Sequence, residues 1–103
     1  MSFDNIVVGD FGQVFKLTFI DVDTGEAADV SSYSTTKQMI FTDPSGNETT
    51  KLATFDTDGS DGIIKYTAED DLIDVRGPWI VRGRVQGGST KLTTMEHSFT
   101  VYN

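Results

Sequence analysis

The stretch from Asp56 to Gly62 has the residue types and spacing that come closest to a metal-binding loop. It reads Asp-Thr-Asp-Gly-Ser-Asp-Gly, so carboxylates and hydroxyls, the oxygen ligands that calcium prefers, recur along it. An EF-hand loop places glycine sixth and glutamate twelfth, whereas this chain has Asp61 and Thr67 there. We therefore predict a hairpin loop of turn-forming residues and no metal site. The alternative is an adventitious or stabilising calcium ion on Asp56, Asp58 and Asp61.

The other residue types of the chain give little support for a catalytic function. The chain has one histidine and no cysteine, and His97 falls in a segment that reads as a β-strand. Ser98 follows it directly, so the two side chains point to opposite faces and cannot form a base–nucleophile pair. Most of the sixteen acidic residues stand in turns, where they usually bond to their own backbone. The sequence thus predicts a non-enzymatic protein without cofactors, with His97 as a structural or surface residue.

Aromatic residues could serve a different chemistry, stacking against the sugar rings of a polysaccharide. Trp79, the one tryptophan, alternates with Val81 and Val85, which is the pattern of a side chain that faces a sandwich core. We therefore predict that Trp79 anchors the core. Tyr33 and Tyr102 remain the aromatic candidates for binding a glycan.

The elements that position these residues are expected to be strands, because apolar and polar residues alternate between closely spaced turns. One turn of helix is expected over residues 68–74, and the Thr-rich segment 48–55 is expected at a sheet edge. In segment 36–42, either Met39 and Phe41 or the neighbouring Ile40 should face the core. Arg82 and Arg84 should lie on an outer face and pair with acidic residues. The expected strands cover residues 6–8, 13–22, 36–42, 48–55, 62–67, 79–85 and 95–102.

Length and charge narrow the possible partners. The 103 residues suit one domain, residues 1–103, with a core large enough to be stable without disulfides. Eight basic and sixteen acidic residues give a net charge of −8, which argues against nucleic acid or an anionic membrane as partner. The N-terminal residues lack the basic start and long apolar run of a secretory signal, so we expect synthesis and folding in a cytoplasm.

Several segments, taken in order, carry a resemblance to a known family. They are Val7-Val8-Gly9-Asp10-Phe11-Gly12, Ala28-Asp29-Val30-Ser31, Asp43-Pro44-Ser45-Gly46, Ile63-Ile64-Lys65-Tyr66-Thr67, Asp71-Leu72, Gly77-Pro78-Trp79-Ile80-Val81 and Phe99-Thr100-Val101. This series resembles the small immunoglobulin-like proteins encoded among the structural genes of tailed bacteriophages. It is also similar to the N-terminal domain of phage baseplate upper proteins.

The resemblance implies an all-β fold, an immunoglobulin-like antiparallel β-sandwich of about seven strands with at most one short helical turn. It implies a structural virion protein, made in the host cytoplasm, that decorates or joins other proteins of the head, neck, tail or baseplate. Its partners would be those virion proteins or further copies of itself, without nucleic acid or membrane. A module that binds polysaccharide or the host surface is the alternative function.

Overall fold

The computed structural model describes residues 6–21, 23–69, 72–88, 90–93 and 96–102. These residues contain nine β-strands and no helix. The strands are β1 (Ile6–Val7), β2 (Val14–Thr18), β3 (Thr36–Thr42), β4 (Glu48–Leu52), β5 (Thr54–Phe55), β6 (Ile63–Thr67), β7 (Gly77–Gly87), β8 (Thr90–Thr93) and β9 (His97–Tyr102).

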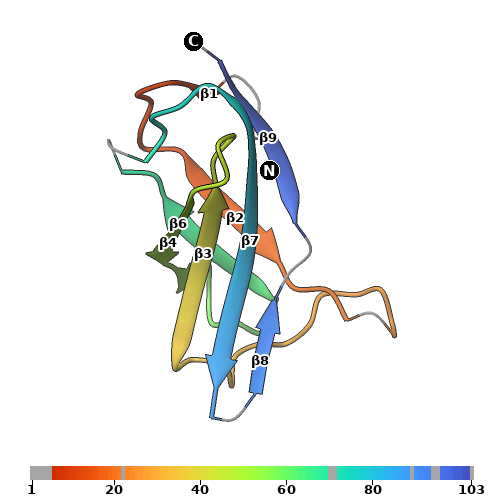
Figure 1. Ribbon diagram of the computed structural model, residues 1–103. Coiled ribbons are helices and arrows are strands. Elements are labelled where there is room, and N and C mark those ends of the chain that lie inside the picture. Colours follow the sequence, from red (N-terminus) through yellow and green to blue (C-terminus); the bar gives the residue numbers. More distant parts are fainter. Residues whose placement is uncertain (1–5, 22, 70–71, 89, 94–95, 103) are drawn as a thin grey trace.

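The strands form two sheets that pack face to face. The larger sheet has the order β1-β9-β7-β3-β4, with β8 also paired to β7, and the smaller has the order β2-β6-β5. Figure 1 looks onto the larger sheet, with β2 and β6 behind it. Neighbours are antiparallel except β1 and β9, which run parallel. Two sheets packed in this way form a β-sandwich, so the predicted all-β fold is confirmed.

The described residues form nine strands, more than the seven or so that the sequence predicted, for two reasons. The predicted strand over residues 48–55 is divided at Ala53. The Ala53 N–H still donates to the carbonyl of Lys37 on β3, whereas the next residue, Thr54, pairs with Lys65 on β6. The first part, β4, therefore belongs to the larger sheet and the second, β5, to the smaller. In addition, β8 forms a hairpin with β7 in a stretch where no strand was expected. The strand predicted over 13–22 is also shorter, since β2 ends at Thr18.

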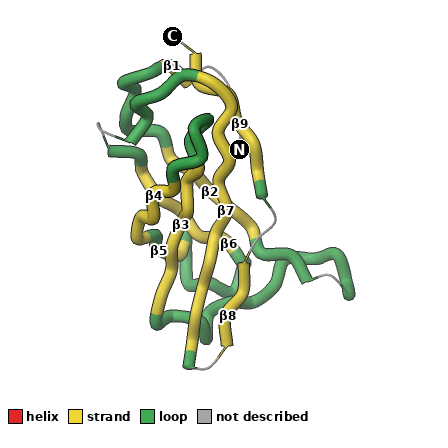
Figure 2. Tube along the Cα trace, in the orientation of Figure 1, coloured by secondary structure: helices red, strands yellow, loops and turns green. Residues whose placement is uncertain are grey.

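The helical turn expected over residues 68–74 is not seen in the part of that segment that is described. Leu72 donates a backbone hydrogen bond to the carbonyl of Glu69, which makes a turn, and the described residues around it are irregular. Residues 70 and 71 lie outside the described residues. Figure 2 shows that loops of this kind collect at the ends of the sandwich, away from the sheet centres.

A single cluster of apolar side chains fills the space between the sheets. Phe15 of the smaller sheet contacts Phe41 and Phe99 of the larger sheet, with ring centroids 5.2 and 5.4 Å apart. Trp79 is 2% exposed, stacks on Phe99 at 6.0 Å, and donates its indole N–H to the carbonyl of Val75 over 2.8 Å. The prediction that Trp79 anchors the core is confirmed.

Candidate functional site

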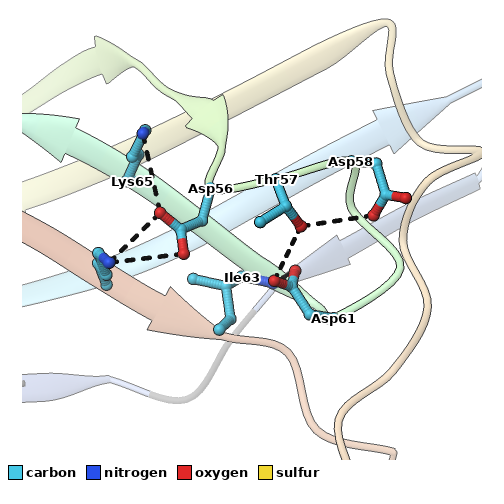
Figure 3. Close-up of polar contacts among 7 residues, drawn as sticks. Asp56, Thr57, Asp58, Asp61, Ile63 and Lys65 are labelled. Carbon is cyan, nitrogen blue, oxygen red and sulfur yellow. Dashed lines mark hydrogen bonds and ion pairs between the residues drawn. The ribbon is translucent and has the colours of Figure 1, made fainter.

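The Asp56–Gly62 loop connects β5 to β6 along one side of the smaller sheet (Figure 3). Asp56 donates its backbone N–H to the carbonyl of Ile63, which closes the loop at its base. Gly59 and Gly62 have φ angles of 91° and 74°, a region that glycine enters without steric cost. The local sequence therefore forms a tight connection because its glycines allow the required backbone reversals.

Asp56 turns away from the other two candidate ligands and toward lysines on the sheet (Figure 3). Its Oδ1 atom lies 3.3 Å from Nζ of Lys16 on β2 and 3.7 Å from Nζ of Lys65 on β6. Lys16 and Lys65 are direct cross-strand partners, so the carboxylate relieves the repulsion between two like charges. A cation at Asp56 would have to compete with both ammonium groups.

Asp58 and Asp61 serve the turn itself. Asp58 Oδ1 accepts hydrogen bonds from the hydroxyl and the backbone N–H of Ser60, at 2.6 and 2.9 Å, and these bonds hold the pKa of Asp58 below its usual value. Asp61 accepts from the Thr57 hydroxyl at 3.0 Å and from the Ile63 N–H at 3.1 Å. Both carboxylates therefore act as turn-stabilising acceptors, as the hairpin-loop interpretation expects.

A second loop repeats this arrangement beside the first. Asp29 Oδ1 accepts from the backbone N–H and hydroxyl of Ser31, at 3.0 and 2.7 Å, and these bonds lower the pKa of Asp29. The Val30 N–H donates to the carbonyl of Gly59 over 2.8 Å, which joins the two loops. Within the described residues no three acidic or histidine side chains gather closely enough to hold a metal. The absence of a metal site remains a prediction to be tested.

The remaining candidates from the sequence lie apart from each other. His97 is exposed at the start of β9, and Trp79 is buried, so it cannot stack on a ligand. Tyr33 is half-buried against the core, whereas Tyr102 is 55% exposed at the end of β9. The structure thus does not bring the two predicted glycan-binding tyrosines into a common row, and glycan binding stays untested.

The Glu48–Phe55 segment lies at an open edge of both sheets, since β4 ends the order of the larger sheet and β5 that of the smaller. The edge position predicted for this segment is confirmed. The backbone N–H of Asp43 donates to the carbonyl of Asn47, and that of Ala53 donates to the carbonyl of Lys37. These two bonds show which residue pairs of β3 and β4 are hydrogen-bonded to each other and which are not. The alternation of an antiparallel ladder then directs the N–H and C=O groups of three residues toward the open edge. They are Glu48, Thr50 and Leu52.

The outer face of the larger sheet carries the two arginines expected there. Arg82 pairs with Glu48 at 3.0 Å, which confirms that part of the prediction. Arg84 makes no ion pair with any described carboxylate, and its buried Nε atom has no hydrogen-bond partner among the described residues. Ile40 is 2% exposed although its side chain points to this face, while Met39 and Phe41 face the core.

Sequence reasoning did not foresee the Lys16–Asp56–Lys65 group or the unpaired charge of Arg84. The alternation of each strand was readable, but the register that sets lysine opposite lysine depends on which strands pair. That information is not contained in the local pattern.

No protein-family model matches this chain, and no curated protein matches it significantly. In the described part of the chain there is no helix long and apolar enough to cross a membrane.

Proposed function

We propose that this protein is a non-enzymatic structural protein of a tailed-phage virion, which decorates or joins other virion proteins of the head, neck, tail or baseplate. The chain would be made in the host cytoplasm and act in the particle. The sequence resemblance to phage immunoglobulin-like proteins supports this proposal, and so does the packing of the two sheets into a β-sandwich. A fold of this kind offers faces, edges and loops to partners.

The observation that carries the proposal is the open edge at β4. Glu48, Thr50 and Leu52 direct backbone groups outward along a five-residue strand, and no described strand pairs with them on that side. Such an edge can accept a strand from a partner, whose main-chain hydrogen bonds then supply affinity. The charged side chains of Glu48 and Lys51 discourage indiscriminate pairing, so a partner strand would need complementary charges.

A proline at the edge tests this joint without breaking the sheet. Thr50→Pro removes an N–H that points away from β3, a position where edge strands tolerate proline. Thr50→Val is the matched control, because it keeps the N–H and a β-branched side chain. Both variants should fold as judged by circular dichroism.

The readout is the number of copies of the chain in purified particles of the phage that encodes it, measured by quantitative mass spectrometry. We expect the wild-type chain and Thr50→Val at full copy number and a strong loss of Thr50→Pro. Full incorporation of folded Thr50→Pro would exclude this edge as the joint. Absence of the wild-type chain from particles, with binding of the purified protein to host polysaccharide, would replace the proposal by the glycan-binding alternative.

A further inference from the structure

The outer face of the larger sheet combines exposed apolar side chains at its edges with positive charge near its centre. Leu52 on β4 is 78% exposed, and Val7 and Tyr102 are exposed on the paired strands β1 and β9. Val7 and Tyr102 lie on the outward side because their strand neighbours Ile6 and Val101 face the core. Leu52 lies there because its partner Gln38 is the neighbour of Met39, which faces the core. These side chains lie at the two edges of the face and do not form one patch, so they offer a partner separate apolar contacts on either side of the charged centre.

The charges on this face have the opposite sign to the chain as a whole. Arg82, Arg84 and Lys91 lie on its β7–β8 side, and Glu48 is the carboxylate that pairs with one of them. The chain nevertheless has a net charge of −8. Arg84 and Lys91 have no ion-pair partner among the described carboxylates. The face is therefore suited to a partner surface that presents carboxylates.

The molecule carries such a surface on its own arm, defined here as the described residues 20–21 and 23–27 of the loop that follows β2. The arm projects from the body of the sandwich at the right of Figure 1. A bridge between Ile20 and Ala27 and the bond from the Asp21 N–H to the Glu26 carbonyl hold it together. Asp21, Asp23 and Glu26 are exposed, and the ion pairs of the described chain include none of them. Ile20 adds an apolar side chain that is 53% exposed.

We propose that the arm of one copy of this chain docks on the outer face of the larger sheet of a second copy. Carboxylates of the arm would pair with Arg84 and Lys91, while Ile20 would contact apolar side chains of the face. A face-to-face dimer would instead bring the positive charges of two copies together. The contact is thus head-to-tail, and it closes into a ring or continues as a chain according to its rotation.

The dimensions of the molecule allow a contact of ordinary size. The molecule extends over 39 × 25 × 24 Å, so its broad face is large enough for the roughly 800 Å² that each partner buries in a standard interface. The inference rests on the assembly role proposed above but does not depend on the β4 edge. Self-association can therefore fail while incorporation into particles succeeds, and the reverse is also possible.

Sedimentation equilibrium of the purified chain at physiological ionic strength tests the contact. The wild-type chain should associate as its concentration rises, and Arg84→Glu should weaken the association about tenfold or more. Arg76→Glu is the matched control, since it makes the same change in net charge at an exposed loop position before β7, at the opposite end of that strand from Lys91. A wild-type chain that stays monomeric at its highest soluble concentration would overturn the inference, as would equal effects of the two variants.

Mixing two charge-reversed variants tests which surfaces meet. The face variant carries Arg84→Glu and Lys91→Glu. The arm variant carries Asp23→Lys and Glu26→Lys; among the described contacts, the Asp23 and Glu26 carboxylates accept no hydrogen bond that holds the arm together. Each variant alone should be monomeric, because its arm and face then have like charges. The mixture should associate again, because the charges of arm and face are then opposite. A mixture that stays monomeric would contradict direct contact between arm and face.

Discussion

Trp79 is one of the large side chains buried in the core between the two sheets. It is 2% exposed, stacks on Phe99 and bonds to the Val75 carbonyl. Trp79→Ala should lower the free energy of unfolding by about 3–5 kcal/mol, because it removes transfer energy and leaves a cavity. Urea denaturation followed by circular dichroism measures this loss. Trp79→Phe should cost less, and an unchanged midpoint in Trp79→Ala would contradict the core role.

Asp58 links the stability of the loop to pH. Its pKa in the folded state lies below the ordinary value of 3.8, chiefly because of the Ser60 hydroxyl and backbone N–H. A depressed pKa stabilises the fold above pH 3.8, and this contribution disappears as the pH falls through the folded-state pKa.

The stability advantage of the wild-type chain over Asp58→Asn should therefore shrink as the pH falls below 3.8. Urea midpoints of both proteins across an acid pH series give the measurement. Asp23→Asn serves as the control, since its carboxylate accepts no hydrogen bond among the described contacts. A difference between wild type and Asp58→Asn that is the same at every pH would contradict the role of ionised Asp58.

Calcium should not stabilise the protein specifically. Asp56 is held by two lysines, and Asp58 and Asp61 are held by turn hydrogen bonds. An ion that bound only the folded chain would raise the melting temperature in a saturable way. We expect no such rise in a calcium titration followed by thermal unfolding. A saturable rise that a chelator reverses would show that the turn interpretation of this loop is wrong.

The residue types of this loop predicted its local behaviour well, because turn aspartates bond within a few positions of themselves. The sequence could not show that Asp56 differs from its two neighbours. That difference comes from Lys16, forty positions away, and from the pairing of β2 with β6.

At the scale of elements, Gly62 fixes how closely the loop after β2 approaches the start of β6. A Cβ atom there would lie 2.5 Å from the Ala28 carbonyl oxygen and 3.1 Å from that of Phe19, and φ is +74°. Gly88 also has a positive φ, +59°, but a Cβ atom there would have open space around it. A comparison of alanine substitutions at Gly62 and Gly88 therefore separates the cost of backbone strain from the cost of a steric clash.

Gly88→Ala should therefore cost about 1–2 kcal/mol of stability, the usual strain of a left-handed residue. Gly62→Ala should cost clearly more, because the neighbouring backbone must also move. Thermal and urea unfolding of both variants give the comparison. Equal losses would mean that the close approach at Gly62 has no energetic consequence.

The alternation of apolar and polar residues predicted the strands correctly where only one face of the strand is buried, as in β6 and β9. Ile40 shows where the pattern fails: Met39, Ile40 and Phe41 are all buried, so alternation could not be read directly. Arg82 and Thr50 flank Ile40 on the neighbouring strands, and the aliphatic stem of an arginine is long enough to cover an apolar neighbour. Ala53 was missed for a different reason, because a change of sheet within one strand leaves no periodic signal.

At the level of the whole molecule, the net charge of −8 does not reveal how charge is distributed over the different faces. Acidic residues concentrate in loops, whereas Arg82, Arg84 and Lys91 share one sheet face. The sequence could exclude a strongly basic protein, yet the local positive surface required the strand pairing. Binding surfaces of this protein are therefore set by topology more than by composition.

Locating the chain in the intact particle is the most direct test of our proposal that it is an assembled part of a phage virion. Cryo-electron microscopy of purified particles of the encoding phage should show the two-sheet sandwich at symmetry-related positions in the head, neck, tail or baseplate. We expect contacts at the β4 edge, at residues Glu48, Thr50 and Leu52. Particles that lack the sandwich, although infected cells contain the chain, would contradict a role in the particle.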